Sequence, residues 1–249
     1  MIVPALALGV VLGICLGALG AGGSIVTVPA LVYLLGQSVS SAITESLTIV
    51  SVSSAVAAIA HVRAGHVRWR TGTGIAIAGA GAAWGGTELS GLVPAGAAMA
   101  AFATLILVVA YALQWQPPVA REARDNGLTG KILATGVLIG LLTGFFGVGG
   151  GFVIVPVLIY FLGYSLQTAV GTSLFIISVN SVIGLLARLD HQAPDWSIVL
   201  PIAVAAIAGS LVGKWLASKI SEVTLRKVFT VALVTVAAYI GVRSAGMLT

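Results

Sequence analysis

The segment 17–29 reads Gly17-Ala18-Leu19-Gly20-Ala21-Gly22-Gly23-Ser24-Ile25-Val26-Thr27-Val28-Pro29, and the segment 144–156 reads Gly144-Phe145-Phe146-Gly147-Val148-Gly149-Gly150-Gly151-Phe152-Val153-Ile154-Val155-Pro156. The two segments lie 127 positions apart, and this offset holds without a gap from Gly13 and Gly140 to Trp69 and Trp196. The chain is therefore a tandem duplication. Because a glycine inside a helix costs about 1 kcal/mol, a glycine cluster in both halves indicates that the backbone has a role there.

The composition is typical of an integral membrane protein. Of the 249 residues, 59% are hydrophobic and 8% are charged, and the mean hydropathy is +1.13. Apolar runs of membrane-spanning length follow one another. Peptide groups in hydrocarbon must be hydrogen-bonded internally, and continuous rather than alternating apolar runs favour helices over a β-barrel. We therefore expect an all-α, polytopic membrane protein.

Several classes of function are disfavoured. The net charge is +5, but the basic residues lie between the apolar segments and form no stripe, so they predict membrane topology and not nucleic-acid binding. The apolar spans contain no Ser/His/Asp set, carboxylate pair or Cys/His cluster. We therefore expect neither an enzyme nor a bound metal or cofactor.

The chain divides into two transmembrane repeats, 1–115 and 131–249, joined by a linker at 116–130 that contains Pro117-Pro118 and a charged run. Each repeat is predicted to have a short helix pair broken at its glycine cluster, followed by three spans. In the first repeat these pieces are 3–20 and 24–36, then 40–60, 72–91 and 95–115.

Charges in the loops predict that the two repeats are inverted. The loop 61–71 has three arginines and no acid, whereas its counterpart at 188–196 has Arg188, Asp190 and Asp195. Because Lys and Arg favour the cytoplasmic side, we place the loop 61–71 and the linker 116–130 in the cytoplasm, below a plasma (inner) membrane. Inversion requires an odd number of crossings per repeat, so the broken pair adds an even number and is interpreted as broken or re-entrant.

The glycine clusters predict an anion site. At a helix start several N–H groups lack an intrahelical partner, and the positive end of the helix dipole points the same way. We expect the N–H groups of these residues to bind a small anion: Gly22, Gly23, Ser24, Gly149, Gly150 and Gly151. Pro29 and Pro156 are predicted to mark the helix break, because proline is favoured in a first helical turn. The alternative is a glycine seam that lets helices pack closely.

A polar series follows each cluster and is predicted to complete the site. Its members are Thr44, Ser46 and Ser53 in the first repeat and Thr172, Ser173 and Asn180 in the second. Ser46 corresponds to Ser173 and Ser53 to Asn180, and residues seven apart share one helix face. Neutral hydroxyl and amide donors can bind an oxyanion without trapping it. The alternative is hydrogen bonding between helices.

Glu45 lies in an apolar span, where ionisable groups are costly. It is a candidate proton-coupling carboxylate, with a position near the water interface as the alternative.

The doubled segment from glycine cluster to proline, Trp69 and Trp196, and the glycine-bearing spans that follow resemble the sulfite exporter TauE/SafE family of membrane permeases. The resemblance covers nearly the whole chain, and Gly147-x-Gly149-Gly150-Gly151 followed by Pro156 is its most specific motif. The first copy departs from it at Ser24, and Thr87-Glu88-Leu89-Ser90 departs from the family pattern. The resemblance implies transport, usually outward, of sulfite, sulfoacetate or related organosulfonates.

The leading hypothesis is therefore an exporter of a small sulfur-containing anion that works by alternating access. One alternative is proton-coupled uptake of another small anion through Glu45. An alternative of another class is a membrane scaffold subunit that transports nothing. The expected partners are the anion and the lipid bilayer, with a homodimer left open by the small-residue faces.

Overall fold

The computed structural model describes residues 2–20, 22–112, 128–147, 151–188 and 193–248, and within these ranges all regular structure is α-helical. The first half contains α1 (Ile2–Leu19), α2 (Gly22–Tyr33), α3 (Val39–Arg63), α4 (Trp69–Gly91) and α5 (Ala95–Ala112). The second half contains α6 (Leu128–Phe146), α7 (Gly151–Tyr160), α8 (Leu166–Leu186), α9 (Trp196–Ala217) and α10 (Glu222–Leu248). The all-α prediction is confirmed, and most of the predicted linker lies outside the described residues.

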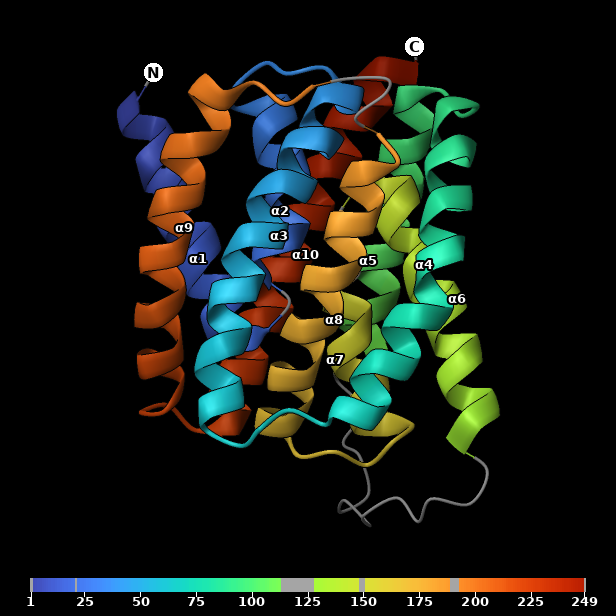
Figure 1. The fold of residues 1–249 in the computed structure, drawn as a ribbon. Helices are drawn as coiled ribbons and strands as arrows, with labels where there is room; N and C mark the ends of the chain where they lie inside the picture. The colour runs from blue at the N-terminus through green and yellow to red at the C-terminus, as the bar shows by residue number, and fades with distance from the viewer. Residues whose placement is uncertain (1, 21, 113–127, 148–150, 189–192, 249) are drawn as a thin grey trace.

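Corresponding helices of the two halves run in opposite directions. In Figure 1, α1 descends from the upper end and α2 returns to it, so the two form a hairpin, and α3, α4 and α5 then cross the molecule in turn. The second half repeats this path from the lower end, where α6 begins. The placement of the two halves across a bilayer, and with it the inverted topology, stays a prediction.

The helices α3 and α8 cross at the centre of the molecule. Both begin at a serine N-cap, Ser38 and Ser165, whose hydroxyl accepts a hydrogen bond from the main-chain N–H three residues later. At the crossing, Ser178 Oγ donates to the carbonyl oxygen of Ser51 at 3.5 Å. Ser51 and Ser178 are 127 positions apart, so the two halves meet here through equivalent residues.

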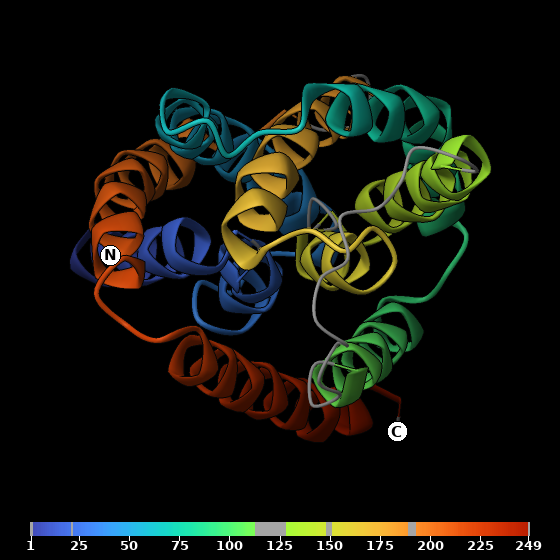
Figure 2. The ribbon, with the colours of Figure 1, turned by 90° about the horizontal axis from the view of Figure 1, so that it is seen from below.

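The two halves are interlocked through glycines. The first helix of each half packs against the fourth helix of the other, α1 on α9 and α6 on α4 (Figure 2). Gly13 faces Ala206, and its equivalent Gly140 faces Gly79 so closely that an added Cβ would lie 2.0 Å from the Gly79 carbonyl oxygen. In lipid, helices associate mainly through such close backbone approach, since apolar side chains gain little by leaving the bilayer.

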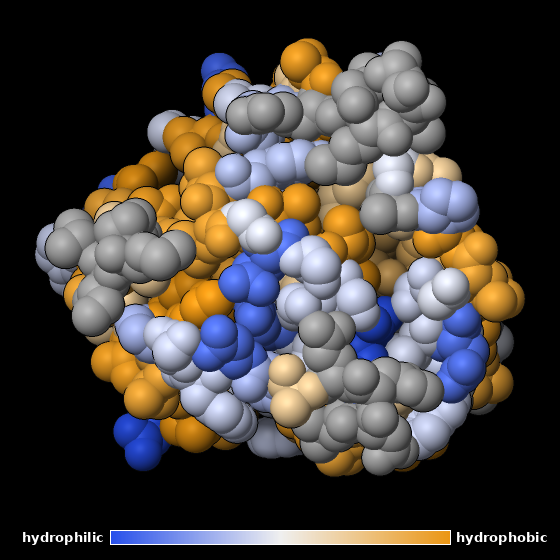
Figure 3. All heavy atoms as spheres, turned by 90° about the horizontal axis from the view of Figure 1, so that it is seen from above, coloured by the Kyte–Doolittle hydropathy of each residue, from blue (hydrophilic) through white to orange (hydrophobic). Residues whose placement is uncertain are grey.

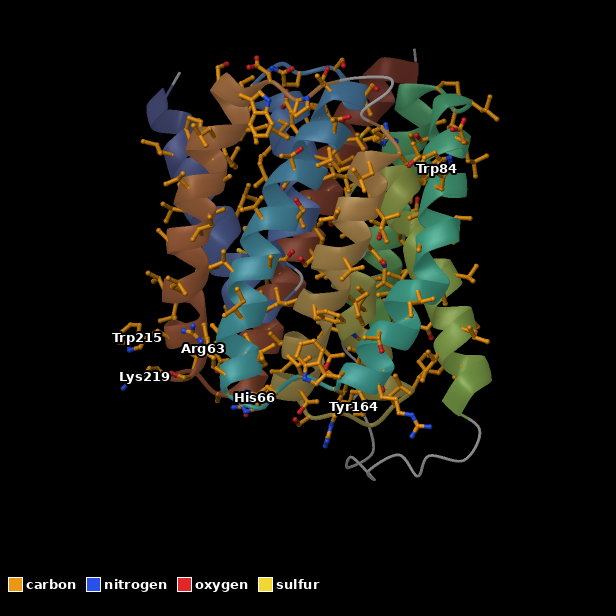
Figure 4. All side chains as sticks on the ribbon, viewed as in Figure 1. Arg63, His66, Trp84, Tyr164, Trp215 and Lys219 are labelled. Carbon is orange, nitrogen blue, oxygen red and sulfur yellow. The ribbon has the colours of Figure 1, made fainter. Side chains whose placement is uncertain are left out.

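The outer surface fits a bilayer. By length and composition alone, α3, α8 and α9 could cross a membrane. The four described tryptophans are exposed and lie near the ends of α4 and α9. Figure 4 places Trp84 near the upper end and Trp215 near the lower end. Tryptophans at two levels are typical of the two membrane–water interfaces.

The helix breaks do not lie at the prolines. Pro29 is inside α2 and Pro156 is inside α7. The first helix of each half instead ends at a left-handed glycine, Gly20 or Gly147, each with φ of +68°. A proline inside a membrane helix is tolerated because neighbouring groups can bond the carbonyl that it leaves free, whereas a left-handed residue ends the helix.

Candidate functional site: two related pockets

Two pockets open at opposite ends of the molecule. The lower one, of about 270 Å³, lies among the end of α3, the start of α8 and the end of α9. The upper one, of about 430 Å³, lies among the start of α3, the end of α4 and the segment after α8. Figure 3 looks onto the upper end, where hydrophilic residues gather over the middle of the face.

The two pockets are repeat equivalents. Most residues that line one have their counterpart, 127 positions away, in the lining of the other. The pairs include Ser40 and Gln167, Ile43 and Val170, Arg188 and His61, Thr87 and Lys214, Ser90 and Ala217, and Phe145 and Ala18. Equivalent residues of the two halves thus line pockets at opposite ends of the molecule.

A glycine break with a serine contact lies beside each pocket. Ser173 Oγ shares its proton between the carbonyl oxygen of Gly20, at 3.1 Å, and that of Val170, at 2.8 Å. In the same way the carbonyl oxygen of Gly147 accepts from Ser46 Oγ at 2.9 Å. Both contacts with glycine join one half of the chain to the other, and each satisfies a carbonyl that the end of the helix leaves free.

The hydroxyls of Ser53 and Thr44, also predicted to bind the anion, donate hydrogen bonds to main-chain carbonyls of their own helix. Ser53 Oγ donates to the Ile49 carbonyl at 2.6 Å. Thr44 Oγ1 donates to the Ser40 carbonyl at 3.4 Å, a long contact. In this conformation the hydroxyl protons of Ser46, Ser53 and Ser173 are already donated to carbonyls. An anion needs donors, so these three groups would have to turn before they could bind one.

Thr172 has a different role from the one expected. Its Oγ1 accepts the main-chain N–H of Arg68 at 3.0 Å, so it holds the α3–α4 loop onto α8. That loop spans 64–68, shorter than the 61–71 expected, because α3 continues to Arg63 and α4 begins at Trp69.

The glycine clusters are described in part. Gly22, Gly23 and Ser24 form the first turn of α2, and Gly151 begins α7 and is buried. Gly149 and Gly150 lie outside the described residues. The helix starts that the anion hypothesis needs are therefore present at Gly22 and Gly151.

Two predicted polar residues are buried without full hydrogen bonding. Asn180 is 0% exposed, and neither of its amide atoms has a hydrogen-bond partner in the structure. Glu45 is 1% exposed and lies near the start of α3, beside Asp195. The Glu45 carboxylate accepts a hydrogen bond from the main-chain N–H of Asp195, but Glu45 Oε2 has no hydrogen-bond partner. Asp195 itself caps α9, and hydrogen bonds from Ser197 lower the pKa of Asp195.

The basic residues of the pockets were missed by the sequence analysis. His61 falls within the predicted loop 61–71, but it lies in α3, is 6% exposed and lines the lower pocket. Lys214 lines the same pocket and donates to the carbonyl of Ala60 near the end of α3. Arg188 lines the upper pocket. The repeat offset could have pointed to two of these residues, since His61 and Arg188 are 127 positions apart and therefore equivalent.

Comparison with known proteins identifies the chain's relatives. The sequence model of the family described as "Sulfite exporter TauE/SafE" matches residues 5–240. This chain belongs to the sulfite exporter TauE/SafE family. It is accordingly a membrane transporter, and the resemblance drawn from the glycine motifs is confirmed.

Relatives in the TauE/SafE family are described as transporters without a named substrate. A "Probable membrane transporter protein" of Xylella fastidiosa (strain 9a5c) is 32% identical over 243 residues, which cover 95% of this chain and 93% of the relative. The "Probable membrane transporter protein YdhB" of Bacillus subtilis (strain 168) is 26% identical and covers 86% of this chain and 90% of its own length. No solved structure matches the chain.

Proposed function

We propose that this TauE/SafE transporter exports a small sulfur-containing anion, such as sulfite, sulfoacetate or a related organosulfonate, by alternating access. The observation that carries the proposal is the pair of repeat-related pockets at opposite ends of the molecule. Interconversion of two such pockets by rocking one set of helices against the other is how inverted-repeat transporters expose one central site to each side in turn.

Charge favours a cytoplasmic lower end. Exposed basic residues gather there, among them Arg63 and Lys219 in Figure 4, together with Arg68, Arg70, Lys131 and Lys227. At the upper end Glu88 and Asp195 are exposed, and Arg188 is buried. We therefore propose a plasma-membrane protein with the α3–α4 loop and the linker in the cytoplasm. An inside-negative potential then favours export by about 2.3 kcal/mol per negative charge and 100 mV.

For the central site we propose the free N–H groups at the starts of α2 and α7, at Gly22–Ser24 and Gly149–Gly151, with the side-chain amide of Asn180. Helix starts bind anions through main-chain donors and the helix dipole. Ser46 and Ser173 contact the carbonyls of the two breaks. Thr44, Ser53 and Thr172 lie on the same two helices, and all five would contribute after their present hydrogen bonds rearrange.

The test is flux in proteoliposomes. Purified protein should carry labelled sulfoacetate or sulfite down an imposed potential, at a rate well above that of protein-free liposomes, and chloride should not compete. Transport that depends on a proton gradient and loses this dependence in Glu45→Gln would favour the uptake alternative. The absence of flux for every sulfur anion tried would contradict the proposal and favour the scaffold alternative.

A further inference from the structure

Arg188 is a buried cation beside a cavity. It follows the C-cap of α8, is 6% exposed and lines the upper pocket of about 430 Å³. Its Nη2 atom donates to the Gly144 carbonyl at 3.1 Å and to Ser90 Oγ, and Ser90 in turn donates to the Thr87 carbonyl. These contacts anchor one edge of the guanidinium to α4 and α6.

No group in the described structure neutralises this charge. Both acceptors are neutral, Arg188 Nε has no hydrogen-bond partner, and no described carboxylate forms an ion pair with the guanidinium. Burial lowers the pKa of Arg188 to about 10, so the side chain stays protonated at neutral pH. Glu88 also lines the pocket, but it is exposed to solvent at the rim.

An unpaired buried charge is costly, because the hydration that it loses is not replaced. An anion in the pocket would remove this penalty. The planar guanidinium donates parallel hydrogen bonds that match two oxygen atoms of an oxyanion. The pocket exceeds the volume of several water molecules, about 30 Å³ each, and therefore has room for a small anion and some of its water.

The other repeat provides an independent observation. His61, at the position equivalent to Arg188, is also 6% exposed, lines the lower pocket, and has no hydrogen-bond partner on either ring nitrogen in the structure. Lys214 lies in the same lining. The duplicated fold thus places a basic side chain at the same point of both pockets.

We propose that the upper pocket is an anion-binding subsite in which the Arg188 guanidinium holds the oxygen atoms of a sulfonate or sulfite group. The anion binds there before it leaves, or after it enters, on the upper face. This inference rests on the proposed function for the identity of the bound anion. It adds one charged donor, the Arg188 guanidinium, to a transport path otherwise built from neutral donors.

Binding to purified, detergent-solubilised protein tests the subsite separately from transport. By calorimetric titration with sulfoacetate, Arg188→Gln should bind at least about tenfold more weakly than the unaltered protein, and Arg188→Lys should lose less. Ser90→Ala removes one neutral anchor and should keep most of the affinity. Lys219→Gln, which removes an exposed cation at the opposite end, should bind as the unaltered protein does. A folded Arg188→Gln variant with unchanged affinity would overturn the proposal.

A second variant leaves Arg188 in place. Ser40→Glu adds a carboxylate to the lining of the same pocket at an exposed position. This variant should weaken sulfoacetate binding about as strongly as Arg188→Gln does. Ser40→Gln, which adds no charge, should not weaken it. Equal affinity in these two variants would also overturn the subsite. Loss of binding in Ser40→Glu without any flux in the unaltered protein would refute the proposed function and leave the subsite standing. Flux that neither Arg188→Gln nor Ser40→Glu alters would refute the subsite and leave the proposed function standing.

Discussion

Gly144→Ala should lower the apparent melting temperature of the purified protein by roughly 10 °C, or prevent recovery of folded protein. The Cβ of an alanine at 144 would lie 1.9 Å from the carbonyl oxygen of Ala83 and 2.9 Å from the main-chain nitrogen of Thr87. Both atoms belong to the backbone of α4, so α4 and α6 must separate. Overpacking costs about 1–3 kcal/mol, which in a chain of this size corresponds to several degrees, and we expect the upper end of that range.

Gly85→Ala is the matched control for this interface. Gly85 lies on α4, one residue from the interface glycine Gly86, and an added Cβ there would meet nothing within 4 Å. Alanine favours a helix by about 1 kcal/mol over glycine, so this variant should melt at the same temperature or slightly higher. If Gly144→Ala melted like Gly85→Ala, the interlocked packing of the two halves would be refuted.

Gly147→Ala should reduce anion flux per folded transporter at least about tenfold. Gly147 has φ of +68°, which costs an L-residue about 1–2 kcal/mol, and its added Cβ would lie 2.3 Å from Ile43 Cγ2 and 2.9 Å from Ile43 Cα. The break must then move away from α3, and the hydrogen bond from Ser46 is lost with it. Initial rates in proteoliposomes, normalised to folded protein, measure the effect.

Gly36→Ala separates backbone conformation from contact with α3. Gly36 has φ of +69°, nearly the same as Gly147, but nothing lies within 4 Å of its added Cβ. We expect a small loss of stability and flux close to that of the unaltered protein. Equal flux in Gly36→Ala and Gly147→Ala would mean that the contact of Gly147 with α3 has no role in transport.

The duplication made much of the fold predictable from sequence. The 127-residue offset correctly pairs every helix of the first half with one of the second, and it located both glycine breaks. The offset could not reveal that α1 packs on α9 and α6 on α4, because it relates equivalent helices and does not show which helices of different halves are in contact. The hydroxyls of Ser46 and Ser173 were for that reason assigned to an anion, whereas in the structure each bonds a glycine carbonyl of the other half.

The basic residues of the pockets were harder to predict than the glycine breaks. Arg188 and His61 lie near helix ends, where a polar residue is usually solvated, and only the packing of distant helices buries them. Pro29 and Pro156 misled for a related reason. Their preference for a first turn is local, whereas the breaks lie at left-handed glycines that pack against a helix of the other half.

The most direct test of alternating access uses Ser40 and Gln167, which are repeat equivalents, are both exposed and line the upper and lower pockets. Each is changed to cysteine in a Cys15→Ala background and labelled with an impermeant maleimide in right-side-out and inside-out vesicles, with and without sulfoacetate. We expect the two cysteines to react from opposite sides, and sulfoacetate to raise the labelling of one while lowering that of the other. Labelling of both from the same side, or labelling that sulfoacetate leaves unchanged at both positions, would contradict alternating access.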